Sequence, residues 1–131
     1  MPIPKIFLSF LFFFVLFNCS VLAQSNITFN VNLKPQLEDS VFIPGQDKIE
    51  IYGNLYPLGM NKTLQLVDKA PIDSIYTVEI RFSRNYNGKN LRYNYVLRTD
   101  EGELRESNPR SINLQKGETE LDAIYFNSFA W

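Results

Sequence analysis

The sequence predicts an all-β domain, built as either a sandwich or a barrel. Short segments alternate apolar with polar residues, which is typical of half-buried strands. The clearest is Tyr76–Phe82, in which Tyr, Val, Ile and Phe occupy every second position. Turn-forming Gly, Pro, Asn and Asp separate these segments at intervals of about 8–12 residues, as in sandwiches and barrels. No stretch of useful length has the 3.6-residue period of an amphipathic helix.

The other strands are expected in order along the chain. Ile27–Leu33 alternates over seven positions, and Lys48–Gly53 follows the turn signal Pro44-Gly45. Pro35–Pro44 is expected to be a polar, acidic connection, and Asn87-Gly88 tolerates the positive φ that closes a hairpin. The remaining expected strands are Leu64–Val67, Leu91–Arg98, Leu104–Glu106, Ser111–Leu114 and Leu121–Phe126.

Residues 1–23 are expected to be a secretory signal peptide, which leaves residues 24–131 as one exported domain. Lys5 precedes an apolar run at Ile6–Phe17, and Val21-Leu22-Ala23 ends on the small residue that signal peptidase favours. The run is shorter than the about 20 residues that span a bilayer. The alternative is a lipoprotein anchored through Cys19, for which Asn18 is larger than the usual preceding residue. We therefore expect secretion or a periplasmic location.

Charge and cysteine content exclude several classes of partner. Without Lys5 the domain carries 12 basic residues (13 minus 1) against 14 acidic ones, and it has no basic stripe. Nucleic acid is therefore not an expected partner. The only cysteine, Cys19, lies in the leader, so no disulfide is expected in the domain.

The chain has no histidine, so Ser-His and Cys-His catalytic pairs and His-based metal sites are not expected. We therefore expect a protein that is not an enzyme and that holds no cofactor. Four acidic residues could supply the carboxylate pair of a glycosidase, but their place in a turn favours solvated charges: Asp100, Glu101, Glu103 and Glu106. Three loop aspartates lack the spacing of a calcium-binding EF-hand: Asp39, Asp47 and Asp68.

Three segments carry a family resemblance. Ile49–Met60 reads Ile-Glu-Ile-Tyr-Gly-Asn-Leu-Tyr-Pro-Leu-Gly-Met, Leu91–Val96 reads Leu-Arg-Tyr-Asn-Tyr-Val, and Arg105–Arg110 reads Arg-Glu-Ser-Asn-Pro-Arg. In this order they resemble the starch-binding domain, the family-20 carbohydrate-binding module. With Phe29-Asn30-Val31 and the closing Trp131 they cover nearly all of the chain after the leader. The resemblance implies an antiparallel immunoglobulin-like β-sandwich of about seven to eight strands that binds α-glucans without chemistry.

The resemblance also implies a carbohydrate-binding site at six positions: Tyr56, Met60, Asn94, Arg105, Glu106 and Asn108. Met60 stands near the family's first stacking tryptophan, and Arg105, or Leu104 with a different gap, stands at the second. Asn94 replaces a lysine of the central strand, and Glu106 and Asn108 match polar partners. Tyr56 could supply the missing aromatic face, or it could pack over the end of the sandwich.

Two arginines in the third segment have two readings. Arg105 and Arg110 could bind acidic sugars, or they could form a surface ion pair with Glu106.

Two functions remain open at the level of sequence. The first is α-glucan binding, either alone or beside a separately encoded glycan-active enzyme. The second is a protein-interaction or structural module of the cell envelope that has lost glycan binding, because neither stacking tryptophan of the family is present.

Overall fold

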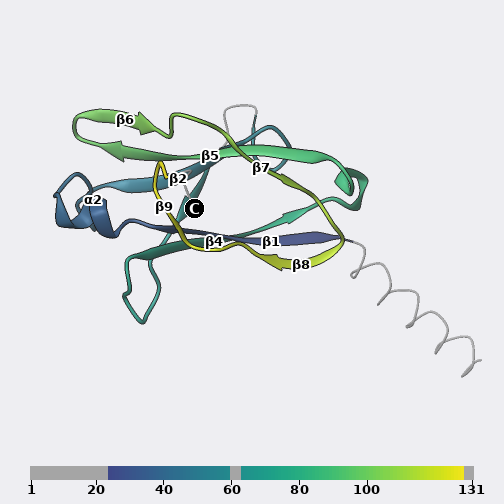
Figure 1. Cartoon of the computed structure of the whole chain (residues 1–131), viewed down its shortest axis with the longest axis horizontal. Coiled ribbons are helices and arrows are strands. Elements are labelled where there is room, and N and C mark those ends of the chain that lie inside the picture. Colours follow the sequence, from purple (N-terminus) through teal and green to yellow (C-terminus); the bar gives the residue numbers. More distant parts are fainter. Residues whose placement is uncertain (1–23, 60–62, 129–131) are drawn as a thin grey trace, which may run out of the picture.

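The computed structural model describes residues 24–59 and 63–128 and confirms the all-β sandwich. Two β-sheets pack face to face and enclose the core between them (Figure 1). In chain order the elements are β1 (Ser25–Asn32), α2 (Lys34–Glu38), β2 (Lys48–Gly53), β3 (Leu64–Leu66), β4 (Ile75–Phe82), the 3-10 turn η1 (Arg84–Tyr86), β5 (Asn90–Thr99), β6 (Gly102–Arg105), β7 (Arg110–Asn113), β8 (Gly117–Glu120) and β9 (Ile124–Tyr125).

Each sheet has one edge that two short strands share. In the first sheet, here sheet A, the order is β4-β1-β8, and β9 also pairs with β1. In sheet B the order is β3-β2-β5-β6, and β7 also pairs with β5. The pairs β1–β4, β2–β3, β2–β5, β5–β6 and β5–β7 are antiparallel, whereas β8 and β9 run parallel to β1. The expected antiparallel sandwich therefore includes two parallel pairings, of β8 and β9 with β1, that the sequence did not predict.

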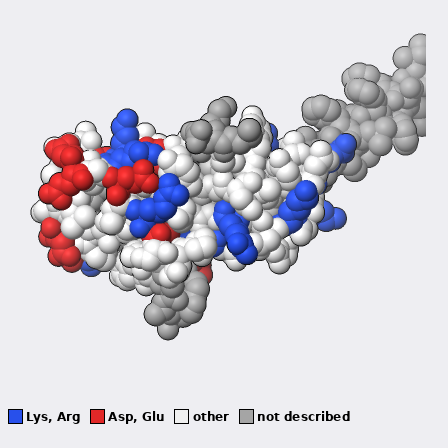
Figure 2. All heavy atoms as spheres, turned by 90° about the horizontal axis from the view of Figure 1, so that it is seen from above, with Lys and Arg blue, Asp and Glu red and all other residues white. Residues whose placement is uncertain are grey.

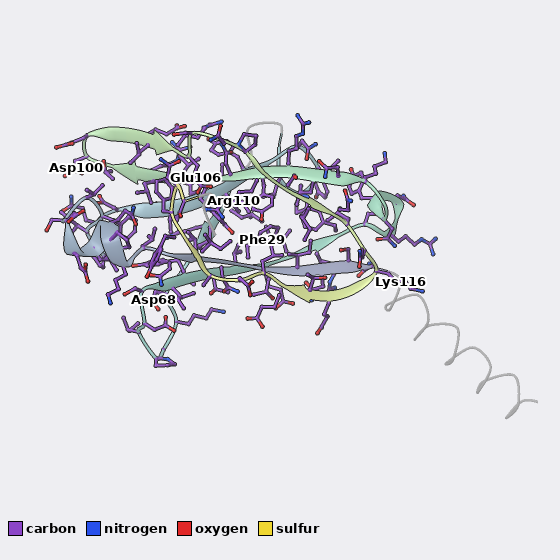
Figure 3. The ribbon with its side chains drawn as sticks, viewed as in Figure 1. Phe29, Asp68, Asp100, Glu106, Arg110 and Lys116 are labelled. Atoms are coloured by element: carbon purple, nitrogen blue, oxygen red, sulfur yellow. The ribbon has the colours of Figure 1, made fainter. Side chains whose placement is uncertain are left out.

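The inner faces of the sheets form the core, as the alternation predicted. Phe29 of β1 has no exposed surface and lies between the two sheets (Figure 3). Its ring contacts Phe82 of β4 edge-on at 6.4 Å and Tyr93 of β5 at 5.0 Å between ring centroids. Each edge-to-face pair of this kind adds about 0.5–1.5 kcal/mol beyond the apolar burial of its two rings. One aromatic ring thus joins the sheets near the middle of the sandwich.

Two elements lie where the sequence indicated none. The segment 34–38 forms one helical turn with Pro35 in its first turn, and Leu37 packs on the core. Five residues are too few to show a helical period. The strand β8 has the sequence Gly-Glu-Thr-Glu and buries no side chain, since it is an edge strand that, among the described strands, pairs only with β1. It therefore lacks the apolar alternation by which the other strands were predicted.

A side chain bridges the gap between β8 and β9. Between β8 and β9 the chain does not pair with β1 as a strand. At this gap the Asn30 Nδ2 of β1 donates to the Leu121 carbonyl at 2.8 Å. The Asn30 Oδ1 accepts from the Thr77 hydroxyl of β4 at 2.6 Å. Asn30 thus joins the segment between β8 and β9 to β4 across β1. This favours a single register for β8 and β9 along β1.

The buried tyrosines predict a loss of stability at alkaline pH. Tyr95 is 1% exposed, and burial, followed by the neighbouring Tyr93, raises its pKa well above the ordinary value, although Arg110 opposes this. Above pH of about 10 the unfolded chain ionises at this residue while the folded chain does not. Unfolding is then favoured, by up to about 1.4 kcal/mol per pH unit for each such tyrosine.

Replacement of Tyr95 by phenylalanine should remove part of this loss. We expect urea unfolding to show a smaller fall in stability between pH 8 and pH 11 for Tyr95→Phe than for the wild type, by about 1 kcal/mol. Equal falls in the two proteins would contradict the raised pKa of Tyr95.

Candidate functional site

The outer face of sheet B collects two of the six residues expected to bind carbohydrate. Asn94 lies opposite Tyr52 of β2 in the strand register, and Arg105 lies opposite Val96. The Arg105 guanidinium lies 4.4 Å from the centre of the Tyr52 ring, within the range of a cation–π contact. Tyr52 was missed by the sequence reasoning, although its position between Ile51 and Gly53 in an alternating strand places it on the outer face.

A charged network fixes the residues around Tyr52. Arg98 pairs with Glu50 at 2.8 Å and with Glu103 at 3.3 Å, and it donates to the Tyr52 hydroxyl at 2.6 Å. The charge of Glu50 is the main cause that raises the pKa of Arg98. Glu103 also pairs with Arg105 at 3.1 Å. Arg105 is therefore held over the Tyr52 ring and covers it, so a sugar could stack on this face only after Arg105 moved.

Tyr56 is the freely exposed aromatic residue of this region. It lies in the loop after β2 and is 67% exposed, which excludes the alternative that it packs over the end of the sandwich. Leu58, two residues later, is buried in the core. Asn54 accepts from the Arg92 backbone N–H at 2.9 Å and donates its own N–H to the Arg92 carbonyl at 3.1 Å. The loop is thus anchored on both sides of a tyrosine that points outward.

A close backbone approach holds the same loop. Gly59 has φ +101°, and a Cβ atom there would lie 2.9 Å from the Gly53 carbonyl oxygen. A side chain at Gly59 would both strain the backbone and push the loop away from β2. This explains the Leu-Gly turn of the sequence. Met60 lies outside the described residues.

Glu106 is not on the outer face, and its pair with Arg110 is not at the surface. The Glu106 side chain is fully buried and that of Arg110 is 10% exposed, so the expected surface ion pair is instead a buried one. Figure 3 shows both residues inside the molecule, beside β9. The sequence could not reveal this, because Glu106 and Arg110 flank a Ser-Asn-Pro stretch that looks like an exposed loop.

Protein donors occupy both carboxylate oxygens of Glu106. Oε1 accepts from the Tyr95 backbone N–H at 3.0 Å, and Oε2 accepts from the Asn127 N–H at 2.7 Å. Arg110 donates to both oxygens, through Nε at 3.0 and 3.2 Å and through a terminal nitrogen at 2.6 Å. Glu106 therefore belongs to the scaffold rather than to a ligand site.

Arg110 extends the same contacts to sheet A. It donates to the Tyr125 carbonyl of β9 at 3.2 Å and lies 5.2 Å from the centre of the Tyr95 ring. Burial alone would lower the pKa of the Arg110 guanidinium. The hydrogen bonds to Glu106 and the negative charge of Glu106 outweigh burial, so the pKa of Arg110 is raised. Asn108, the last of the six positions, lies exposed in the loop between β6 and β7.

The described part of the chain contains no group of three acidic, histidine or cysteine side chains placed to hold a metal ion. Within the same residues, no helix is long and apolar enough to cross a membrane. No protein-family model matches the chain, and no curated protein sequence matches it. The function must therefore be argued from the surface geometry and from the resemblance of the three sequence segments.

The buried ion pair predicts strongly coupled mutational effects. Loss of one member leaves the other charge buried without its partner, which costs about 3–5 kcal/mol. We expect Glu106→Gln and Arg110→Met each to destabilise the fold by about 3 kcal/mol or more, and the double variant to lose less than the sum. Urea unfolding of the four proteins measures this coupling.

The matched control is the exposed pair of Arg105 and Glu103, whose side chains are 48% and 38% exposed. Arg105→Ala should cost at most about 1 kcal/mol. Additive losses for the Glu106 and Arg110 variants, within about 0.5 kcal/mol, would show that the two side chains do not act as a pair.

Proposed function

We propose that this protein is an exported, non-catalytic carbohydrate-binding domain whose ligand is an α-glucan. The observation that supports this proposal best is the exposed ring of Tyr56 on an anchored loop. A pyranose ring offers an apolar face of C–H groups, and a flat aromatic side chain is its usual partner in proteins. The choice of α-glucan rests on the resemblance of the three segments to the starch-binding domain.

The outer face of sheet B supplies polar groups near the base of the Tyr56 loop. The loop leaves β2 beside Arg92, and Asn94 lies two residues further along the same face of β5. Arg105 and Tyr52 continue this face toward β6. Amide and guanidinium groups in such positions could fix the hydroxyls of a sugar that stacks on Tyr56, since a few placed polar groups orient a ligand.

A binding role without catalysis is consistent with the chemistry of the chain. The sequence contains no histidine, and its only cysteine precedes the domain. Glu106, one of the four carboxylates that could have served a glycosidase, is enclosed by protein donors. We therefore propose that any chemistry on the glycan is carried out by a separately encoded enzyme.

A second candidate function is supported by the covered ring of Tyr52. Because Arg105 lies over this tyrosine, Tyr52 gives the outer face no second open aromatic platform among the residues that the structure describes. A sandwich of this kind could instead serve as a protein-interaction or structural module of the envelope. Binding of starch, glycogen or cyclodextrin by the purified protein decides between the two candidates.

Replacement of Tyr56 tests the proposed platform. We expect Tyr56→Ala to weaken binding to glycogen and β-cyclodextrin by about tenfold or more, equivalent to about 1.4 kcal/mol, because the stacking face is removed. Affinity electrophoresis in glycogen gels and calorimetry with β-cyclodextrin measure the change.

Tyr125→Ala is the matched control, since Tyr125 is also an exposed tyrosine, 47% exposed, but lies on β9 of the other sheet. It should leave the affinity within about twofold of the wild type. Equal affinity of the Tyr56→Ala and wild-type proteins would remove Tyr56 from the site. Absence of binding by the wild type to all three glucans would refute the α-glucan proposal.

A further inference from the structure

Three of the seven large apolar residues exposed in the described part of the chain line a single groove. They are Val41 and Ile43, in the connection between α2 and β2, and Leu104 of β6. Each is 44–48% exposed, and the groove between the connection and the β5–β6 hairpin has a volume of about 490 Å³. Single exposed apolar residues are ordinary, but convergence of three on one groove is typical of an interaction site.

The rim of this groove is acidic. Asp100 and Glu101 form the turn between β5 and β6, and both are exposed. Neither forms an ion pair with a residue that the structure describes, although Asp100 accepts from the Gln46 amide at 2.7 Å. Figure 2 shows acidic side chains gathered at this end of the molecule, with basic ones beside them and along the rest of the same face.

The walls of the groove are fixed from inside. Asp47, also at the groove, is nearly buried and accepts from the Ile43 backbone N–H at 2.8 Å. The Gln46–Asp100 hydrogen bond ties the connection to the hairpin tip. The groove is therefore formed before any partner arrives, which lowers the entropic cost of binding.

The strand β6 offers a free backbone edge beside the groove. It pairs only with β5 among the described strands. The Glu106 N–H points to β5, where it donates to the Tyr95 carbonyl. Because bonding alternates along an antiparallel strand, the N–H groups of Glu103 and Arg105 should point away from β5. Such an edge is a template for an added extended strand.

We propose that this groove and the β6 edge bind an extended segment of a partner protein in which apolar residues alternate with lysine or arginine. The segment adds to the β6 edge as a strand. Its apolar side chains lie between Val41, Ile43 and Leu104, and its basic side chains lie beside Asp100 and Glu101. This surface is distinct from the Tyr56 loop, so the inference goes beyond carbohydrate binding and does not depend on it.

A fluorescein-labelled peptide of sequence Leu-Lys-Leu-Lys-Leu-Lys tests the proposal by fluorescence anisotropy. We expect it to bind more tightly than Leu-Glu-Leu-Glu-Leu-Glu and Ser-Lys-Ser-Lys-Ser-Lys, by about tenfold or more. Leu104→Ser should weaken binding about tenfold, and the double variant Asp100→Asn, Glu101→Gln about threefold. In NMR spectra the peptide should shift the amide signals of Glu103 and Arg105.

The control variant is Ile72→Ser, because Ile72 is 77% exposed but does not line the groove. It should bind the Leu-Lys peptide as the wild type does. Val41→Ser should weaken peptide binding but leave retention in glycogen gels unchanged, which separates this proposal from the carbohydrate one.

Three results would overturn the proposal. One is equal binding of the three peptides, and another is equal loss in Ile72→Ser and Leu104→Ser. The third is occupation of the groove by a second copy of the chain or by a lipid surface. Sedimentation would then show self-association, or phosphatidylcholine vesicles would bind the protein, and Leu104→Ser would abolish the effect.

Discussion

The buried pair of Glu106 and Arg110 is the interaction on which the rest of the structure depends. Along one edge of β5 the pairing strand changes from β6 to β7. The Tyr95 N–H lies at this change, where neither strand offers it a backbone carbonyl. The Glu106 carboxylate accepts from this N–H instead and also accepts from Asn127, while Arg110 neutralises the carboxylate and reaches the Tyr125 carbonyl of the other sheet. Two charges without water are stable only when their hydrogen bonds are made, and here they are.

This constraint separates the scaffold from the surfaces that are free to bind. A carboxylate enclosed by the Tyr95 and Asn127 backbone and by Arg110 has no remaining role toward a sugar. The recognition that we propose therefore falls to residues outside the core. These are Tyr56 on its anchored loop, the outer face of sheet B around Arg105, and the acidic groove near Leu104. Leu104 and Arg105 are neighbours on β6 with side chains on opposite faces, whereas Tyr56 lies on a separate loop, so a mutation in the Tyr56 loop need not disturb the groove.

The sequence predicted the strands that bury one face, and among the strands that bury no side chain it missed β8. Lys48–Gly53 was predicted with its observed bounds, because Ile49 and Ile51 alternate with polar residues and face the core. The strand Gly117–Glu120 was missed because an edge strand without buried side chains carries no alternation. The candidate site was only partly predictable. The exposure of Tyr56 depends on how Leu58 anchors its loop, and the burial of Glu106 depends on contacts with residues far away in sequence.

Native-state hydrogen exchange at the Asn127 amide tests the role of the ion pair most directly. Asn127 lies near the end of the described chain. Amides near chain ends ordinarily exchange quickly, because such segments open locally at little cost in free energy. If Glu106 and Arg110 fasten this segment to β5, the Asn127 N–H should be protected nearly as strongly as the Tyr95 N–H in the centre of sheet B. Rapid exchange at Asn127 beside slow exchange at Tyr95 would show that the pair does not join the two sheets.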